Sequence, residues 1–310
     1  MSADADASFD RATGALLGLA VGDAVGTTLE FRPRDSYVHI TDMVGGGPFD
    51  LKPGGWTDDT SMALALADSL ENMPEFDEKD LLTRFVAWWR HGRYSHNDLC
   101  FDIGMTTRAA LARFEESDAP HCGSPHPEAA GNGSLMRLAP VAIRFHADRP
   151  RLVDIAARQS KTTHAAPEAV SACVAFAEVL ADAIEGQPKP EVLRPRAGDY
   201  AGTIAPIMAG GWRALTRKTV GSSGYVVHSL AAALWCVERT ENYRDAVLLA
   251  ANLGDDADTT AAITGQLAGA LYGASGIPGT WVVRLAWSDA IRATAGRLAH
   301  SSRGTARLAK

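Results

Sequence analysis

Hydrophobic residues recur at the three- and four-residue spacing of an amphipathic helix through almost the whole chain. In residues 9–25 the apolar face carries Leu16, Leu17, Ala20 and Val21. The same spacing continues over residues 61–70, 81–89, 106–114, 135–145, 152–157, 169–184, 226–237, 246–253, 260–272 and 283–298. The pattern therefore predicts an all-α fold, a compact single domain of many packed helices.

The alternation of β-branched residues that is typical of strands is almost absent. Residues 37–44 form the one short strand candidate. The helical pattern breaks at residues 32–55, 116–133 and 186–198. The first two breaks are long for connectors in a compact fold, so we expect them to be functional loops.

No break has the composition of a linker, and no repeat of 20 to 50 residues is present. We therefore expect one domain over residues 1–310, with flexible tails at residues 1–8 and 301–310. Small residues recur at every fourth position in two of the predicted helices, which lets backbones approach closely, and we interpret them as packing positions only. These residues are Gly14, Gly18, Gly22 and Gly26, then Gly265, Gly269 and Gly273.

Composition narrows the functional classes. Apolar residues make up 46% and charged residues 22% of the chain, as in globular proteins. The net charge of −7 lacks the Lys and Arg surplus that nonspecific binding of nucleic acid or anionic membranes needs. The polar, acidic start resembles no secretion or mitochondrial signal, and charges interrupt each apolar run, so we expect no membrane span. The scattered cysteines fit reduced thiols in a cytoplasmic protein rather than disulfides or a zinc site.

Two acidic segments, WTDDT at residues 56–60 and GDDADTT at residues 254–260, each precede an alanine-rich helical run. One acid at such a place is an ordinary helix cap. If the two segments meet in space, up to five carboxylates crowd together, which requires protonation or bound cations. Oxygen ligands favour Mg²⁺ or Mn²⁺, with Ca²⁺ as an alternative, and two clusters suggest two cations bridged by a carboxylate such as Asp258. The alternative interpretation is capping alone.

Further segments offer weaker signals. Glu30 has apolar neighbours and could orient a water, or be an exposed helix-end residue. The turn GNGSLMR at residues 131–137 could hold a phosphate or ribose oxygen through its N–H groups, although it is not a dinucleotide fingerprint. His164 could contact a ligand, or be a structural histidine. Asp102 could act as an acid, or be a helix cap. The turn GSSGY at residues 221–225 could cover a diphosphate, or be an idle loop.

Seven segments, in the order in which they occur, resemble the ADP-ribosylglycohydrolase family. They are GLAVGDAVGTTLEF, LKPGGWTDDTSMALAL, FDIGMTTRAAL, GNGSLMRLAPVAI, TTHAAPEA, GSSGYVV and GDDADTTAAITGQLAGALYG. The resemblance is closest to the bacterial branch typified by dinitrogenase reductase-activating glycohydrolase. It runs from about residue 9 to beyond residue 278, and the T-D-D-T segment paired with a late D-x-D-T is its most specific part.

The resemblance implies a compact all-α fold with two divalent cations, Mg²⁺ or Mn²⁺. It places Glu30 beside the metals and Asp102 near the ribose as an acid. The family usually has Gly where this chain has Asp255, which adds a charge. The implied metal ligands are Thr57, Asp58, Asp59, Asp256, Asp258 and Thr259, and the implied residues of the ADP-ribose cleft are Asn132, Gly133, Ser134, Met136, His164, Gly221, Ser222, Ser223 and Tyr225.

The function that the resemblance implies is hydrolysis of the N-glycosidic bond between ADP-ribose and a protein side chain, with arginine as the first expectation. Three alternatives stay open. The substrate could be serine-linked, O-acetyl or nucleic-acid-linked ADP-ribose; the chain could be an immunity protein that binds and neutralises an ADP-ribosylating toxin; or it could be a relative without catalysis. The expected partners are an ADP-ribosylated protein and a cognate ADP-ribosyltransferase or toxin.

Overall fold

The structure, a computed structural model, describes residues 3–73 and 75–308. In that part of the chain the regular elements are helices, and extended pairing is limited to isolated bridges such as Gly46 with Leu51. The α-helices are α1 (Ala3–Gly26), α2 (Asp58–Asn72), α3 (Glu78–His91), α4 (Met105–Ser117), α5 (Ala139–Phe145), α6 (Arg149–Thr163), α7 (Pro167–Glu185), α8 (Lys189–Val192), α9 (Ile204–Met208), α10 (Val226–Glu238), α11 (Tyr243–Ala251), α12 (Ala257–Tyr272), α13 (Gly279–Arg284) and α14 (Ser288–Leu308). Short 3-10 helices are η1 (Thr27–Leu29), η2 (Pro127–Ala129), η3 (Gly211–Ala214) and η4 (Ala274–Gly276). The predicted all-α fold is confirmed.

Local sequence signals define several of these helices. The side chain of Asp77 accepts hydrogen bonds from the first turn of α3, and Asp148 and Asn242 do the same for α6 and α11. Gly92 and Gly186 end α3 and α7 in the left-handed conformation that glycine adopts most easily. By contrast, Thr57 and Asp256, the N-cap residues of α2 and α12, make no side-chain capping bond, although both helices have acidic residues in their first turn.

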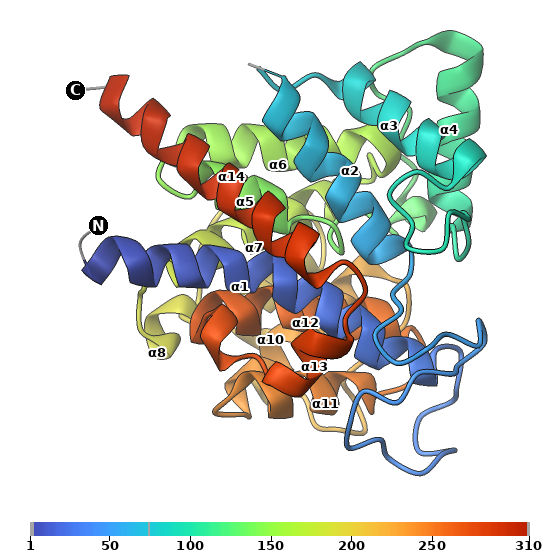
Figure 1. Ribbon diagram of the computed structural model, residues 1–310, viewed down its shortest axis with the longest axis vertical. Helices are drawn as coiled ribbons and strands as arrows, with labels where there is room; N and C mark the ends of the chain where they lie inside the picture. The colour runs from blue at the N-terminus through green and yellow to red at the C-terminus, as the bar shows by residue number, and fades with distance from the viewer. Residues whose placement is uncertain (1–2, 74, 309–310) are drawn as a thin grey trace.

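Helices α1 and α12 form an antiparallel pair at the centre of the molecule, with α14 crossing α1 (Figure 1). Glycines make this pair unusually close. A Cβ added to Gly14 would lie 2.1 Å from the carbonyl oxygen of Gly269, and one added to Gly22 would lie 2.2 Å from that of Ala261. The interpretation of these glycines as packing positions agrees with this geometry. The pairing also brings the end of α1 beside the beginning of α12.

The other helices surround this pair. Helix α2 packs against α3, α5 and α14, while α6 packs on α7, and α10 and α11 pack on α12 (Figure 1). Their buried apolar side chains form one continuous core that includes Leu16, Trp56, Phe176 and Ile263. The described residues therefore fold as one domain. The segment that joins η1 to α2 has no helix and reaches the beginning of α12, since Phe31 N–H donates to the Asp255 carbonyl (2.8 Å).

Several predicted elements need correction. Residues 37–44 are not a strand, because their neighbours offer no partner strand and Ile40 N–H bonds instead to the side chain of Asn252 (2.9 Å). The helix predicted over 135–145 begins only at Ala139, since residues 131–137 form a turn at the cleft described below. The helix predicted over 283–298 is divided into α13 and α14 by a kink at Trp287, whose φ is 59°.

The expectation that no apolar stretch is long enough to span a membrane is also wrong. Residues Ala5–Leu29 have the length and apolar composition of a span. However, 94% of the most apolar part of this stretch is buried inside the protein, as is typical of the central helix of a hydrophobic core. Flexible tails at residues 1–8 and 301–310 stay a prediction; residues 1, 2, 309 and 310 lie outside the described residues.

Candidate metal centre and active-site cleft

Asp23, near the end of α1, holds the first turn of α2. Its Oδ1 accepts hydrogen bonds from the N–H and the hydroxyl of Thr57, both at 2.9 Å. Its Oδ2 accepts from the N–H and the hydroxyl of Thr60, at 3.0 and 2.6 Å. Asp23 thus does the capping from another helix, which leaves Asp58 and Asp59 of α2 with no capping role. The capping-only interpretation of the first acidic segment is wrong.

Three buried carboxylates meet where α1, α2 and α12 converge. Asp23, Asp59 and Asp258 each contribute an oxygen to a group in which these atoms lie within 4.8 Å of one another. The hydroxyls of Thr57 and Thr259 complete the group, because each donates to Asp59 Oδ2, at 3.4 and 3.3 Å. The two acidic segments, about two hundred residues apart, therefore do meet, as the sequence predicts.

A second group of carboxylates shares one member with the first. Glu30, Asp256 and Asp258 also place one oxygen each within 4.8 Å of the others. Glu30 Oε2 accepts from the backbone N–H groups of Ala257 (2.8 Å) and Asp258 (3.3 Å), at the positive end of α12. Asp256 accepts from the side-chain amide of Asn132 (2.6 Å). Asp258, which is 1% exposed, therefore lies between the two groups and is placed to bridge two ions.

The charge of these groups is not balanced by the protein. None of the five carboxylates forms an ion pair with Lys or Arg of the described residues, whereas Asp182, which is also buried, pairs with three arginines. Burial and then the Asp258 charge raise the pKa of Asp23 and of Asp256 to about 7. Burial and the neighbouring acids also raise the pKa of Asp59 well above its usual value. Such crowding is tolerable only with bound protons or cations.

The donor set fits hard divalent cations. It consists of carboxylate and hydroxyl oxygens, without histidine or cysteine. The Oδ1 atom of buried Asp59 has no hydrogen-bond partner among the described residues, which leaves one oxygen directed at no protein donor. Buried carboxylate oxygens are rarely left without a partner unless an ion or water contacts them. The residues present therefore fit one or two Mg²⁺ or Mn²⁺ ions.

Asp58 and Asp102 stand beside these groups rather than in them. Both line the open cleft next to the carboxylates. Burial and then the charges of Asp58 and Asp258 raise the pKa of Asp102 to about 11, while burial and Asp258 raise the pKa of Asp58 well above normal. Asp102 adopts a left-handed φ of 59°, on the segment before α4. Burial and then the Asp258 charge raise the pKa of Glu30 as well, so Asp102 and Glu30 both readily keep a proton.

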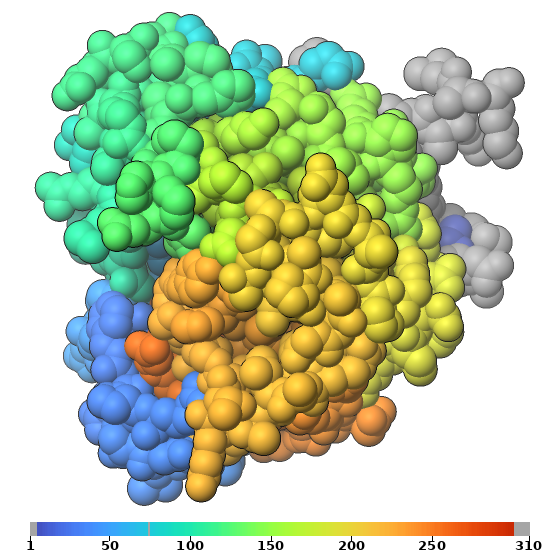
Figure 2. Space-filling model, turned by 180° about the vertical axis from the view of Figure 1, so that it is seen from behind, coloured from blue at the N-terminus to red at the C-terminus, as the bar shows by residue number. Residues whose placement is uncertain are grey.

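The cleft has a volume of about 520 Å³ and opens above the carboxylates. Its lining comes from the segments after α1, before α4, before α5 and before α12, which come together on the face shown in Figure 2. Of the sequence-predicted cleft residues, Asn132, Gly133, Met136 and His164 line it. Asn132 is fixed by three bonds: its N–H donates to the Gly224 carbonyl (3.1 Å), and its amide donates to Ser229 (2.8 Å) and to Asp256.

His164 is a buried wall of this cleft. Burial and the nearby positive charge of Arg137 lower the pKa of His164 to about 3, so the ring is neutral. Its Nδ1 is within 2.8 Å of the Thr163 hydroxyl. Its other edge lies under the turn, because a Cβ on Gly133 would be 2.7 Å from the ring. Only glycine fits there, so this glycine lets the turn close onto the ring.

Other predicted cleft residues lie elsewhere. Ser134 is buried under the turn and bonds to Ser160 (2.8 Å). Ser222 and Ser223 face away from the cleft lining: the Ser222 carbonyl accepts from Asp256 N–H (2.9 Å), and the Ser223 hydroxyl bonds to His228 (2.8 Å), against which Gly221 packs. These residues position the turn through their hydrogen bonds, and the backbone of the turn is then free to contact a ligand.

Tyr225 lines an adjoining cavity of about 620 Å³. This cavity shares Thr106, Gly131 and Gly224 with the cleft, so the two hollows are continuous. The hydroxyl of Tyr225 donates to Glu168, and burial and that carboxylate raise its pKa. A ligand longer than one sugar ring can therefore extend from the carboxylates along the glycine turns to the ring of Tyr225.

Comparison with known proteins identifies the family of the chain that forms this cleft. A family model described as ADP-ribosylglycohydrolase matches residues 4–307. The chain belongs to the ADP-ribosylglycohydrolase family. It is therefore a hydrolase of this family, and the resemblance read from its motifs is confirmed.

Three relatives and one solved structure are similar to this ADP-ribosylglycohydrolase over most of its length. It is 50% identical over 292 residues to ADP-ribosylarginine hydrolase Tri1 of Pseudomonas putida (strain GB-1), covering 94% of this chain and 78% of the relative. It is 47% identical to the protein of the same name from Serratia proteamaculans (strain 568), covering 92% and 77%. Identity to the ADP-ribosyl-[dinitrogen reductase] glycohydrolase of Rhodospirillum rubrum is 32%, covering 89% and 90%. A solved "ADP-ribosylglycohydrolase-related protein complex" superposes with a TM-score of 0.86 at 39% identity, covering 96% of this chain and 99% of the other.

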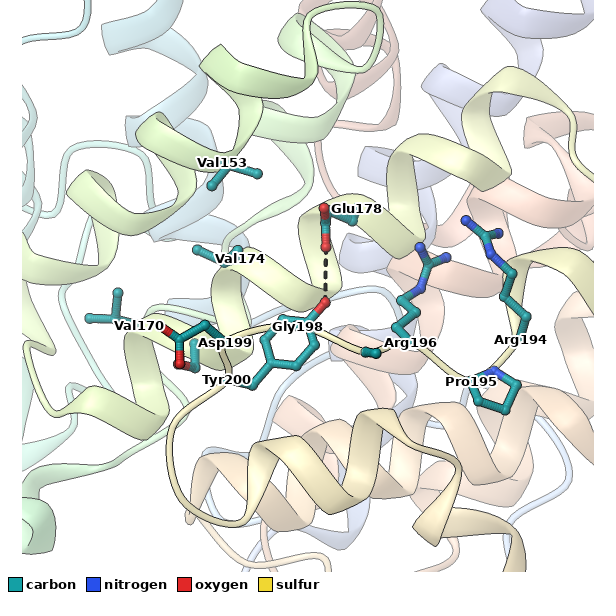
Figure 3. Close-up of a pocket in the computed structure, with 12 residues that line it drawn as sticks. Val153, Val170, Val174, Glu178, Arg194, Pro195, Arg196, Gly198, Asp199 and Tyr200 are labelled. Atoms are coloured by element: carbon teal, nitrogen blue, oxygen red, sulfur yellow. Dashed lines mark hydrogen bonds between the residues drawn. The ribbon is translucent and has the colours of Figure 1, made fainter.

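A further cavity of this ADP-ribosylglycohydrolase, about 650 Å³, lies beside α6 and α7 (Figure 3). Its two arginines are already paired. Arg194 and Arg196 bind Asp182 at 2.8 and 2.6 Å, and Tyr200 donates to Glu178 at 3.1 Å. Neither metal-ligating group lies there. The carboxylate cleft is therefore the candidate site.

Reasoning from the sequence missed one central residue of this ADP-ribosylglycohydrolase. The segment GLAVGDAVGTTLEF contains Asp23, which has no role among the predicted site residues, yet it anchors α2 and stands in the first carboxylate group. A signal was present, because an acidic residue in the last turn of a helix opposes the helix dipole and needs a compensating partner. Glu168 was missed as well, since no local pattern reveals which turns share a cavity wall.

Proposed function

We propose that this chain hydrolyses the N-glycosidic bond between ADP-ribose and an arginine side chain of a protein. The single observation that carries the proposal is the pair of carboxylate groups that share Asp258 at the floor of an elongated cleft. The names of the two relatives near 50% identity support arginine as the acceptor. The continuous hollow that runs from the carboxylates to Tyr225 gives room for a dinucleotide-sized ligand.

Two divalent cations, Mg²⁺ or Mn²⁺, are proposed at the carboxylates. Asp23 already accepts two hydrogen bonds on each oxygen, so it shapes the site more than it ligates. The proposed ligands are Thr57, Asp58, Asp59 and Thr259 for one ion, Glu30 and Asp256 for the other, and Asp258 for both. When bound, the cations would neutralise the crowded carboxylates and hold the 2″ and 3″ hydroxyls of the distal ribose.

The protein's own groups would position the ligand and move the protons. The cleft fixes the ribose next to Glu30 and Asp102, so that a water can attack C1″ in a defined geometry. In the reaction the water oxygen bonds to C1″, the bond from C1″ to the guanidine nitrogen breaks, and the departing guanidine takes up a proton. Glu30 or Asp102 is proposed to accept the water proton or to donate one, since burial and the neighbouring acids raise the pKa of both.

The proposed function is tested by following release of free ADP-ribose from an ADP-ribosylated arginine peptide. The expected result is turnover with Mg²⁺ or Mn²⁺ and none with a chelator, restored when the metal is added back. Asp58→Ala and Asp258→Ala are expected to abolish release. A serine-modified peptide run in parallel compares the two linkages. Metal-independent release, or full activity of either variant, would reject the proposal.

A further inference from the structure

Asp255 stands at the mouth of the cleft on a turn that is held on both sides. Its N–H donates to the Arg32 carbonyl and its carbonyl accepts from Phe31 N–H, each at 2.8 Å. Arg34 donates to the neighbouring Leu253 carbonyl (2.9 Å). With φ of 63°, Asp255 is in the left-handed region, which a non-glycine residue occupies at a cost of order 1 kcal/mol or more. The turn therefore presents this carboxylate in a fixed place.

The Asp255 carboxylate interacts electrostatically with the guanidinium of Arg34 but is not bonded to it. It makes no hydrogen bond or ion pair with a side chain of the described residues. It is exposed and lines the cleft, whereas Asp256 next to it is half-buried, Asp258 is buried, and both belong to the carboxylate groups. A fixed, unpaired and solvated carboxylate at the mouth of a cleft is a ready site for a cation on a ligand.

Phe31 provides a second element at the same place. Its ring lines the cleft, is 64% exposed and meets Phe49 only by an edge, with centroids 6.4 Å apart. Its φ of 60° is unusual for a bulky residue, and the backbone bond to Asp255 holds it there. An aromatic face next to a carboxylate suits a planar guanidinium, which stacks on the ring while its N–H groups reach the acid.

We propose that Asp255 and Phe31 form the subsite for the departing arginine and give the enzyme its preference for that acceptor. The proposal rests on the proposed function, since it names what occupies the outer end of that same cleft. On the proposed function the carboxylates hold the ribose, and the exposed residues Asp255 and Phe31 line the same cleft, where the acceptor arginine would lie. A serine acceptor has no positive charge and no plane to stack, so it gains nothing from either residue.

The test compares Asp255→Asn with wild type on an arginine-modified and a serine-modified ADP-ribosyl peptide of otherwise equal sequence. Asparagine keeps the shape and tolerates left-handed φ, so the turn is preserved. The expected result is a KM for the arginine peptide about fivefold to tenfold higher, with kcat nearly unchanged, because a partly solvated charged pair contributes little more than that. The KM for the serine peptide and inhibition by free ADP-ribose are expected to stay as in wild type.

Two further variants complete the design. Asp50→Asn removes the same charge from another exposed, left-handed aspartate (φ 50°) that does not line the cleft, and it should leave both KM values unchanged. Phe31→Leu should raise the arginine KM by about twofold to fivefold.

Two results distinguish a failure of the proposed function from a failure of the arginine subsite alone. Wild type that does not cleave the arginine peptide overturns the proposed function and the subsite with it. Wild type that cleaves the peptide while Asp255→Asn matches it in KM overturns the subsite alone. An equal loss on both peptides, or weaker inhibition by ADP-ribose, also overturns it, because Asp255 would then serve the ADP-ribose moiety.

Discussion

The substitution Asp258→Asn should have opposite effects on stability with and without metal. Asp258 is shared by both carboxylate groups, and its charge is the second cause, after burial, of the raised pKa of Asp23 and of Asp256. A pKa raised from 3.8 to about 7 disfavours each ionised carboxylate by about 4 kcal/mol. Burial is the larger part, so removing the Asp258 charge should relieve about 1 kcal/mol at each, or about 2 kcal/mol together.

In a chelator at pH 7, the variant should therefore melt about 3 °C above wild type, given the unfolding entropy of a chain of this size. With Mn²⁺ at a hundred times its Kd, wild type should gain about 2.7 kcal/mol, while the variant, which lacks the shared ligand, should gain much less. The order of the two melting temperatures should thus reverse when the metal is added.

The pH dependence has a defined sign. Because the folded protein keeps protons on Asp23 and Asp256 that the unfolded chain loses, their contribution is full below pH 3.8 and is lost as pH rises through about 7. The advantage of Asp258→Asn in chelator should accordingly shrink from pH 7 toward pH 4. Differential scanning calorimetry measures both effects, with Asp50→Asn as the charge-matched control. A variant less stable than wild type in chelator, or equally stabilised by Mn²⁺, would refute the account of a charge-crowded metal site.

Two further predictions concern the frame of the site. Gly22→Ala would place a Cβ 2.2 Å from the Ala261 carbonyl oxygen and should cost about 2 to 3 kcal/mol in denaturant unfolding, whereas Gly279→Ala, with no atom within 4 Å, should cost much less; equal losses would contradict the close packing of α1 on α12. His164, whose pKa is lowered to about 3, stabilises the fold fully above its unfolded pKa of 6.5, and this contribution is lost as pH falls toward 3. Wild type should therefore lose about 2 kcal/mol more than His164→Gln between pH 7.5 and pH 5, and His91→Gln, at an exposed position, should behave as wild type; identical losses in all three proteins would count against a buried neutral ring.

Much of the fold follows from the spacing of apolar residues, because a helix buries a stripe that the sequence displays directly. The long helices α1, α7, α10 and α12 were predicted nearly in full. The break between α13 and α14 was not, because the left-handed Trp287 has no local signal such as glycine. The supposed strand at residues 37–44 is fixed by the side chain of Asn252, a tertiary contact that periodicity does not contain.

The site was predictable to the extent that its chemistry is concentrated in short segments. The two acidic segments predict the position of the carboxylates, and the expected crowding of those carboxylates predicts bound cations. The capping role of Asp23 and the continuity of the cleft with Tyr225 arise from the antiparallel packing of α1 on α12 and from turns far apart in the chain. The cytoplasmic location and a transferase or toxin as partner stay predictions.

The most direct test of the metal centre is the anomalous scattering of manganese in crystals of this protein grown with Mn²⁺. Two peaks are expected, one contacted by Asp59 and Asp258 and the other by Glu30, Asp256 and Asp258. Crystals that contain manganese elsewhere but show no anomalous density among these carboxylates would contradict this expectation.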